Sequence, residues 1–320
     1  MTDFSKARIR CSTIYGIMGG LSRKTPMQEY LDCAAEIADK QLRMANMKKK
    51  DGNGYAKLIA TEEQLQACLK VLEIVKDQPL PLSPGAKTLC TTIYADIKYG
   101  KWNPTKDIGN KYTAKGKAAE EASIDLVSKL ENQSFKKNEL LVQNEFLRGT
   151  PDIIVGNDVY AAEKIVDVKS PWDCETFFGN LNDELVQQYK FQMQGYMAIT
   201  NAPVAEVHFC MVDIPDFMWQ KERQNLFNRM EVVTDEDIDF KIAEAQLFRN
   251  LHFGDMPPEE RRIKFIVERD DELIKKIYEQ VEKVREYLPI VEKMHLFGRD
   301  SVLLPEISEV IEKSENNPES

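Results

Sequence analysis

The segment Ile165-Val166-Asp167-Val168-Lys169 constrains the chain more than any other stretch. Successive side chains of a strand point to opposite faces, so Asp167 and Lys169 share one face, about 7 Å apart, and the two valines share the other. An apolar face of this kind packs on a core, which predicts a strand within a larger sheet. The polar face is either an ordinary solvated face or part of a metal site.

Asp152 supplies a second carboxylate. It follows Pro151 at the start of a strand-like run and lies 15 residues before Asp167, which leaves room for a strand, a tight turn and a returning strand. Two carboxylates brought together repel unless a hard cation lies between them. Mg²⁺ fits, because it binds one or two carboxylates and keeps water and substrate phosphate as other ligands. Lys169 would then help to deprotonate a metal-bound water or stabilise charge on the phosphate.

The helix that precedes these strands offers a third carboxylate, Glu120 or Glu121. The helical period places Glu120 on the apolar stripe with Ile124 and Val127, whereas Glu121 falls on the polar side. Glu120 is therefore the candidate. Downstream, Gln192 and Tyr196 lie four residues apart on one helix face, which is also what an ordinary amphipathic helix would show.

Other site types find little support. The six cysteines include no CxxC pair, which argues against zinc, an iron–sulfur cluster or a disulfide framework, and isolated cysteines are usually buried apolar residues. The three histidines are scattered, and His208 falls within an apolar run as a core-strand residue. No Gly-rich phosphate loop or GxSxG motif occurs.

Helices dominate the first hundred residues. Thr25-Pro26 with Gln28 forms a capping box that opens a helix reaching to about residue 50, and Thr61 with Gln64 predicts a second start. Further helices are predicted near 83–99, 115–130, 183–200, 216–231, 234–250 and 270–288, the last ending at Pro289. Strand-like runs occupy 139–147, 151–155, 158–161, 163–169 and 204–212, and Gly156-Asn157 joins the middle pair.

The net charge of −10 is unfavourable for a chain that binds nucleic acid, but a local basic patch can still bind phosphate. Lysines gather between Lys98 and Lys117, including Lys115, as either a backbone-binding patch or a solvated face. Trp172 either stacks on a base or packs against the sheet edge. Neither a signal peptide nor a stretch that could span a bilayer is evident, so we expect a cytoplasmic protein, in a bacterial host if viral.

These motifs together resemble a known group. The run Gly116 to Glu120, the Gly-Thr-Pro-Asp152 segment, Asp167-Val-Lys169-Ser-Pro, and Gln192-Met-Gln-Gly-Tyr196-Met look like the YqaJ-like viral recombinase family, which includes the lambda-type phage exonuclease of the PD-(D/E)XK nuclease superfamily. The opening Ile9-Arg10-Cys11-Ser12 also looks like that family's first segment. Asp167 is the second acidic residue of the motif, a position at which that superfamily more commonly has Glu.

The resemblance implies an α/β (α+β) fold with a restriction-endonuclease-like core, in which a mixed central sheet is flanked by helices. It implies Mg²⁺, for which Mn²⁺ can substitute, held by Glu120, Asp152, Asp167 and the Val168 carbonyl. Lys169 would assist the attacking water and Gln192 would position it. Arg8, Arg10 and Ser12 would hold a terminal phosphate, and Lys115, Lys117, Trp172 and Tyr196 are further candidates for contact with DNA.

The implied activity is 5′-to-3′ digestion of duplex DNA for phage-type recombination. The implied partners are duplex DNA ends, a single-strand annealing protein and other copies of the chain in a trimeric ring. Association with a membrane is not expected. Two alternatives stay open: a structure-specific endonuclease or RecB-like single-strand nuclease, and a non-catalytic DNA-binding scaffold. Retention of all five candidate catalytic residues disfavours the scaffold.

The expected segments are four. Residues 1–84 form a DNA-end segment with a helical insertion, 85–215 the nuclease core, 216–305 a helical region packed on the core, and 306–320 an acidic, disordered tail.

Overall fold

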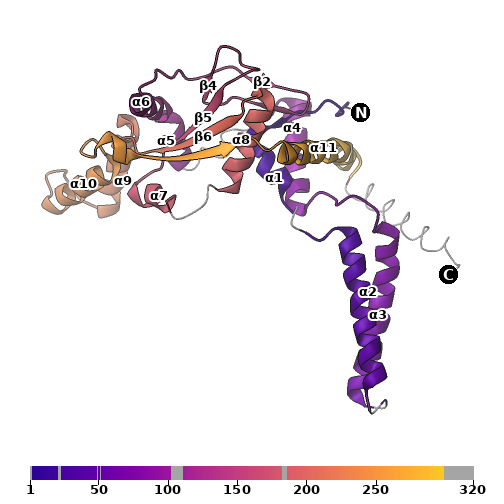
Figure 1. Cartoon of the computed structure of the whole chain (residues 1–320). Helices are drawn as coiled ribbons and strands as arrows, with labels where there is room; N and C mark the ends of the chain where they lie inside the picture. Colours follow the sequence, from indigo (N-terminus) through magenta and orange to yellow (C-terminus); the bar gives the residue numbers. More distant parts are fainter. Residues whose placement is uncertain are drawn as a thin grey trace. The chain divides into compact units, whose positions relative to one another are not determined.

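A computed structural model describes residues 2–20, 23–48, 50, 52–101, 111–181 and 186–298 (Figure 1). Backbone contacts divide the chain into two compact units. The helical unit comprises Met1–Phe4, Ile17–Tyr94 and Lys283–Ser320, and the sheet unit comprises Ser5–Gly16 and Ala95–Glu282. The four segments expected from the sequence stay a prediction, and residues 306–320 lie outside the described part.

The helices are α1 (Ile14–Met18), α2 (Pro26–Asn46), α3 (Asn53–Val75), α4 (Pro84–Tyr99), α5 (Lys111–Ala118), α6 (Glu120–Glu131), α7 (Cys174–Gly179), α8 (Gln187–Thr200), α9 (Asp216–Met230), α10 (Ile238–Leu251) and α11 (Asp271–Phe297), with 3-10 turns η1 (Cys11–Thr13) and η3 (Pro258–Arg261). The strands are β1 (Ile9–Arg10), β2 (Val142–Gln143), β3 (Leu147–Gly149), β4 (Ile153–Val155), β5 (Lys164–Lys169), β6 (Val204–Cys210) and β7 (Arg262–Glu268). Within the described residues, no helix is both long and apolar enough to cross a membrane.

The sheet unit contains two mixed sheets. In the first, of order β1-β3-β2, β1 runs parallel to β3, and Ile9 lies opposite Leu147. In the second, of order β4-β5-β6-β7, the β5–β6 pair is parallel and both outer pairs are antiparallel. The mixed sheet with flanking helices agrees with the architecture expected from the sequence.

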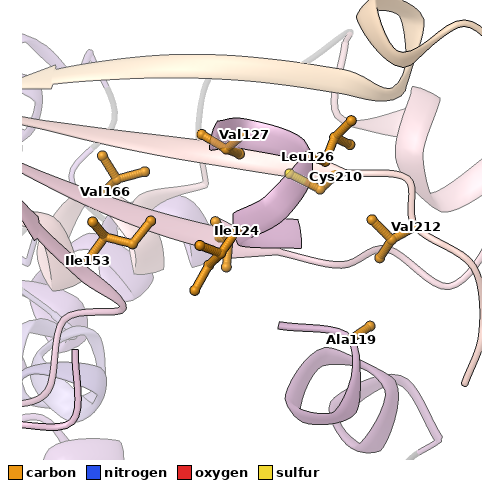
Figure 2. Packing of buried hydrophobic residues seen from close by; sticks show 9 residues of the cluster. Ala119, Ile124, Leu126, Val127, Ile153, Val166, Cys210 and Val212 are labelled. Carbon is orange, nitrogen blue, oxygen red and sulfur yellow. The ribbon is translucent and has the colours of Figure 1, made fainter. Parts of the chain in front are cut away.

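Helices cover both faces of the second sheet. Val166 and Val168 of β5 pack with Ile124 and Val127 of α6 in a buried apolar cluster (Figure 2). The alternate side chains point the other way, where the ring of Phe209 on β6 lies 5.8 Å from that of Tyr189 on α8. As a result, β5 is buried on both faces, and its polar residues lie inside the protein.

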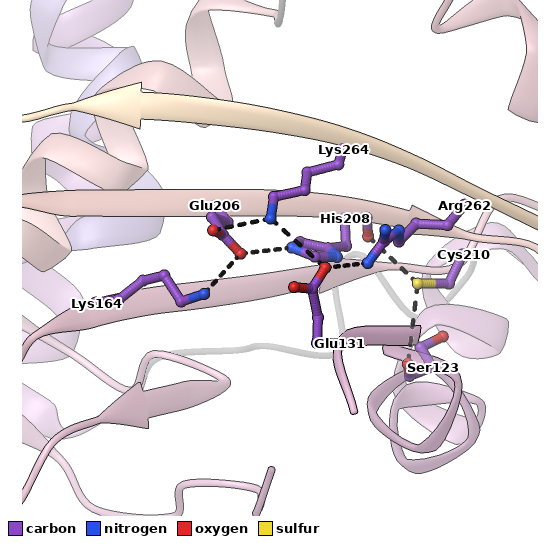
Figure 3. Close-up of polar contacts among 8 residues, drawn as sticks. All are labelled: Ser123, Glu131, Lys164, Glu206, His208, Cys210, Arg262 and Lys264. Atoms are coloured by element: carbon purple, nitrogen blue, oxygen red, sulfur yellow. Dashed lines mark hydrogen bonds and ion pairs between the residues drawn. The ribbon is translucent and has the colours of Figure 1, made fainter. Parts of the chain in front are cut away.

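A charged network occupies part of the α6 face (Figure 3). Glu206 on β6 is paired with Lys164 at 3.1 Å, Lys264 at 3.0 Å and His208 at 3.0 Å. Lys264 also lies 3.5 Å from Glu131 of α6. Burial alone would raise the pKa of Glu206, but hydrogen bonds from His208, Lys264 and Lys164 outweigh it and lower that pKa to about 2. His208 is fully buried in the central strand, as its sequence context predicts.

Two local predictions in the centre of the chain are wrong. The helix expected over 115–130 is broken at Ala119, so α5 ends at Ala118 and α6 begins at Glu120. Ala119 is itself buried, and its carbonyl accepts from the N–H of Ser123, so the apolar periodicity continues through the break and hides it. The run 158–161 is a turn, and β4 pairs directly with β5.

The C-terminal region differs from the mostly helical expectation. It contributes β7 to the sheet, paired along its length with β6. Helix α11 also continues through Pro289 to Phe297. Leu288 and Val291 around the proline are buried, and burial of such side chains, at about 1.5 to 3 kcal/mol each, offsets the cost of about 3 kcal/mol for an interior proline.

In the helical unit, α2 and α3 form an antiparallel hairpin (Figure 1). The capping box is present as predicted: Thr25 Oγ1 accepts from Gln28 N, and Gln28 Oε1 accepts from Thr25 N. The start predicted at Thr61 is wrong, because α3 begins at Asn53 and the Thr61 hydroxyl donates to the Lys57 carbonyl inside the helix.

Candidate active site

Asp167 is the most deeply buried of the predicted metal ligands. It lies on β5 with 1% of its side chain exposed and forms an ion pair with Lys169, two residues along the same face. Apart from the Lys169 ammonium, no donor in the described part of the chain bonds to its carboxylate oxygens. A buried carboxylate with so few donors is costly, so a further positive charge beside it would stabilise its charged form.

Asp152 comes immediately before β4, close to β5. Its Oδ2 accepts a hydrogen bond from Val168 N at 2.8 Å. Asn138 fixes the approach, since its side chain donates to the Pro151 carbonyl at 2.9 Å and its N–H donates to the Asp152 carbonyl at 2.7 Å. Burial, followed by the negative charge of Asp167, raises the pKa of Asp152 well above its usual range. The negative charge of Asp167 therefore destabilises the charged form of Asp152.

Lys169 bears the opposite charge. Burial opposes its ammonium form, but Asp167 and Asp152 outweigh that effect and raise its pKa. Its Nζ lies 5.2 Å from the centre of the Tyr189 ring on α8. The side chain is 24% exposed, so the ammonium connects the buried carboxylates with solvent.

Glu120 is the first residue of α6, directly after the break at Ala119. Its Oε2 lies 3.2 Å from Lys137 Nζ, and its side chain is 20% exposed. Glu121 is exposed on the polar side of the helix, as the helical period indicates. The break matters because it brings a carboxylate and the N-terminal end of a helix to the same place.

These residues meet at one cleft of about 470 Å³. Its walls come from α5, α6, β5 and the segment after β5, and the lining residues are Tyr112, Thr113, Gly116, Lys117, Glu120, Asp152, Val168, Lys169, Ser170, Pro171, Trp172, Thr176, Asn180, Tyr189 and Phe209. Three predicted site residues (Glu120, Asp152 and Lys169) and the Val168 backbone therefore converge there. Asp167 lies behind Lys169, buried beneath the cleft wall.

No group of three or more His, Cys, Asp or Glu side chains within the described residues is arranged as a ready-made metal cluster. Two of the acids near the cleft are instead held in ion pairs, Glu120 with Lys137 and Asp167 with Lys169. The residue types nevertheless suit a hard cation, because carboxylate and carbonyl oxygens are the ligands that Mg²⁺ prefers. Two further residues contact the candidate site, Lys137 through Glu120 and Asn138 through the Pro151–Asp152 segment, and no sequence motif indicated either of them.

Gln192 and Tyr196 form a chain of hydrogen bonds beside the cleft. Gln192 Nε2 donates to the Tyr196 hydroxyl at 2.9 Å, and that hydroxyl donates to the Thr150 carbonyl at 3.3 Å. Burial and the nearby Asp167 raise the pKa of Tyr196 well above its usual value. Both side chains therefore support the Thr150–Asp152 segment.

Lys115 is a correction to the candidates for contact with DNA. Its side chain is fully buried, and its Nζ donates to the carbonyls of Pro171 at 2.7 Å and Trp172 at 3.1 Å. A lysine held in this way cannot reach a phosphate backbone. Burial lowers its pKa to about 8.

Trp172 packs with Ile214, Met218 and Leu251 and is 5% exposed. The tryptophan is therefore packed in the protein, as one of its two interpretations held, but against α9 and α10 rather than the sheet edge, and it also lines the cleft. Lys117, two residues after the buried lysine, is exposed at the cleft, and Lys111 Nζ lies 4.4 Å from the centre of the indole ring.

The N-terminal candidates lie on and next to β1. Arg10 Nε lies 3.2 Å from Asp96 Oδ2, and Arg148 of β3 contacts the same carboxylate. Arg8 is exposed and its Nε donates to the Asn144 carbonyl at 2.6 Å, and Ser12 is exposed. Asp96 and Arg148 were absent from the sequence-based set, since only the tertiary structure places Arg148 beside Arg10 through the β1–β3 pairing and brings Asp96 of α4 to both.

The sequence matches no known family model and no curated protein. The structure matches a phage-related exonuclease from Haemophilus somnus 129PT, at a TM-score of 0.53 and 23% identity, covering 90% of this chain and 96% of that one. The alkaline exonuclease LHK-Exo from Laribacter hongkongensis matches at a TM-score of 0.45 and 14% identity, over 69% of this chain and 88% of that chain. The structure of its complex with dAMP matches at a TM-score of 0.43 and 14% identity, over 73% of this chain and 92% of that chain. At 23% identity the first likeness shows the fold alone, and the shared fold agrees with the mixed sheet flanked by helices expected from the sequence.

Proposed function

We propose that this chain is a divalent-metal-dependent deoxyribonuclease that digests duplex DNA from the 5′ end towards the 3′ end. The observation that carries the proposal is the buried Asp167 carboxylate, which bonds only to the Lys169 ammonium among the described residues, next to a second buried carboxylate, Asp152, below a cleft that Lys169 reaches. Buried carboxylates normally accept several hydrogen bonds. A cation-binding site accounts for this arrangement.

The residues fit a hard divalent cation. Asp152 and Asp167 would bind it, with Glu120 and the Val168 carbonyl as further ligands, and Mg²⁺ is the ion we expect, with Mn²⁺ as a substitute. When bound, such an ion acts as a Lewis acid on phosphate and lowers the pKa of a coordinated water. Lys137, which pairs with Glu120 at 3.2 Å, would exchange that contact for one with solvent or phosphate.

The protein's own groups set the geometry. Lys169 holds an ammonium between Asp167 and the cleft, where it can donate to a phosphate oxygen and to the attacking water. Gln192, through Tyr196 and the Thr150 carbonyl, positions the segment that ends in Asp152. The hydrogen bond from Val168 N holds Asp152 against the strand that bears Asp167 and Lys169.

The preference for DNA ends rests on the resemblance to the lambda-type group and on the fold shared with a phage-related exonuclease. Lys117 and Lys111 at the cleft are placed to contact the phosphate backbone. Arg8, Arg10 and Ser12 on the β1 side are proposed to hold the terminal phosphate. A role in phage-type recombination, with a strand-annealing partner and a ring of three copies in the cytoplasm, follows from the same resemblance.

Digestion of linear duplex DNA labelled at the 5′ or the 3′ end tests the proposal, with Mg²⁺, with Mn²⁺ and with EDTA, and with a covalently closed circle alongside. We expect metal-dependent release of the 5′ label and an intact circle. A nicked or linearised circle would replace the exonuclease with an endonuclease. No cleavage with either metal would leave a DNA-binding scaffold.

A further inference from the structure

The α2–α3 hairpin of the helical unit has one feature that packing within the hairpin does not explain. Helix α2 buries Cys33 and Ile37 towards α3, yet α3 has no fully buried residue. Its inner side is formed by half-buried leucines, such as Leu58, Leu65 and Leu69. A helix of 23 residues normally buries an apolar stripe, so α3 has capacity for another neighbour.

A second apolar stripe runs along α3 on the side nearly opposite the inner leucines, spread over about 120° around the helix axis. Ile59 is 37% exposed and Val71 is 53% exposed, with the exposed Ala67 between them and the half-buried Ile74 at the end. Helices that are apolar on two sides occur in bundles, where each helix contacts two others. The hairpin supplies only one of these contacts.

Two charges interrupt this stripe, Glu63 and Lys70, and both are exposed. Within the described residues neither makes a hydrogen bond or an ion pair. They lie seven residues apart, too far to pair along one helix. Four residues nevertheless lie within about 60° of one another around the helix axis: Ile59, Glu63, Lys70 and Ile74.

The four positions are symmetric along the chain. Glu63 and Lys70 lie equally far from the point between Gln66 and Ala67, and Ile59 and Ile74 also lie equally far from it. A two-fold axis at that point would therefore place Glu63 against Lys70 of an antiparallel copy, twice, and Ile59 against Ile74, twice. An interface that is complementary to itself in this way is what a two-fold pair requires.

We propose that α3 is a self-association surface, on which a second copy of this chain packs antiparallel to form a four-helix bundle from two hairpins. A parallel pair would oppose Glu63 to Glu63 and Lys70 to Lys70, so the charges select the antiparallel arrangement. Ala67 at the centre lets the two backbones approach closely. The surface belongs to the helical unit alone and is independent of the proposed nuclease chemistry.

Charge reversal tests the pairing in the full-length chain, with molar mass measured by sedimentation velocity over a concentration series. Glu63→Lys and Lys70→Glu each turn both opposed pairs into like charges. Each should raise the dissociation constant by at least about tenfold and halve the molar mass at concentrations where the wild type is paired. The double variant Glu63→Lys/Lys70→Glu restores opposite charges and should regain the wild-type mass.

Mixing the two single variants gives a further readout. One then carries two lysines and the other two glutamates on this line, so equal amounts should form a mixed pair that neither forms alone. Lys57→Glu, an exposed reversal elsewhere on α3, is the matched control and should pair like the wild type. Circular dichroism checks that the helices are retained.

A wild type that stays unpaired at every concentration would overturn the proposal. So would single variants with the mass of the wild type, or a double variant that does not recover. Cleavage activity plays no part in these readouts, so the failure of the nuclease proposal would leave this test unaffected.

Discussion

The backbone N–H of Val168 donates to Asp152 Oδ2 at 2.8 Å, which ties the residue before β4 to the strand that carries Asp167 and Lys169. The antiparallel β4–β5 pairing fixes the same approach, with Ile153 opposite Val166. The proximity of the two acids is therefore a property of the hairpin, and a change in charge at either acid should leave the backbone in place.

Asp167→Asn and Lys169→Ala should each reduce cleavage of linear duplex by at least about a hundredfold, because the first removes a carboxylate that would bind the cation and the second removes the ammonium that can donate to the phosphate. Folding should persist, since Asn keeps the shape of the buried side chain and Lys169 reaches solvent. Single-turnover cleavage and circular dichroism measure the two properties. Glu121→Gln, on the exposed side of α6, is the control, and normal turnover in Asp167→Asn would exclude this site.

Divalent metal should stabilise the folded protein before any substrate is added. The repulsion between Asp152 and Asp167 is relieved by a cation, so saturating Mg²⁺ or Mn²⁺ should raise the melting temperature by roughly 5 °C. Asp152→Asn and Asp167→Asn should lose most of this shift, as followed by scanning calorimetry with and without EDTA. An equal shift in both variants would place the metal elsewhere.

Acid should destabilise the sheet unit in two steps. Burial lowers the pKa of His208 from its ordinary 6.5, so the unfolded chain takes up that proton first and the free energy of unfolding falls as the pH drops below 6.5. The lowered pKa of Glu206 adds a second loss as the pH falls from 4.5 towards 2. Denaturant titrations between pH 8 and 2 measure both. The first step should be absent in His208→Gln, and its persistence there would assign it to another group.

Lys115 and Lys117 should respond in opposite ways. Lys115→Met leaves the Pro171 and Trp172 carbonyls without their donor and should lower the free energy of unfolding by about 2 to 3 kcal/mol. Lys117→Ala should leave stability unchanged, weaken DNA binding and reduce the slope of affinity against salt by about one ion. Denaturant titration and binding at several salt concentrations separate the two, and a stable Lys115→Met would contradict the buried assignment.

Gly195→Ala should destabilise the sheet unit by about 1 to 3 kcal/mol, because a Cβ there would lie 2.4 Å from Ile14 Cδ1 and 3.1 Å from Cys11 Sγ. Gly179→Ala, at the end of α7 with nothing within 4 Å, is the control and should have little effect. Thermal unfolding compares them. Equal melting temperatures would show that the η1 segment does not press on α8.

The active-site strand was predictable because burial imposes a strict period of two. Val166 and Val168 had to face the core, which fixed the direction of Asp167 and Lys169 without any tertiary information. The same period was present in Arg262–Glu268, where Ile263, Phe265 and Val267 alternate with a set of residues that is charged at all positions but Ile266, so β7 could have been found. What the sequence could not supply was register: no local pattern pairs Arg10 with Asp96 or Glu120 with Lys137.

The two Thr-x-x-Gln segments show the limit of local signals. At Thr25 the box is real, because Pro26 favours the first helical position. At Thr61 the same letters lie inside α3, since residues 55–60 already form helix and the hydroxyl bonds back to Lys57. A cap depends on what precedes it as much as on its own residues.

The parallel pairing of β1 with β3 has a consequence for biosynthesis. Arg8 bonds to Asn144, 136 residues further along the chain, so the first strand finds its partner only after nearly half of the protein has left the ribosome. Until then β1 and the buried Ile9 remain unsatisfied, and contacts of such sequence separation form slowly. The N-terminal segment should therefore be the last part of the sheet unit to become protected from hydrogen exchange during folding.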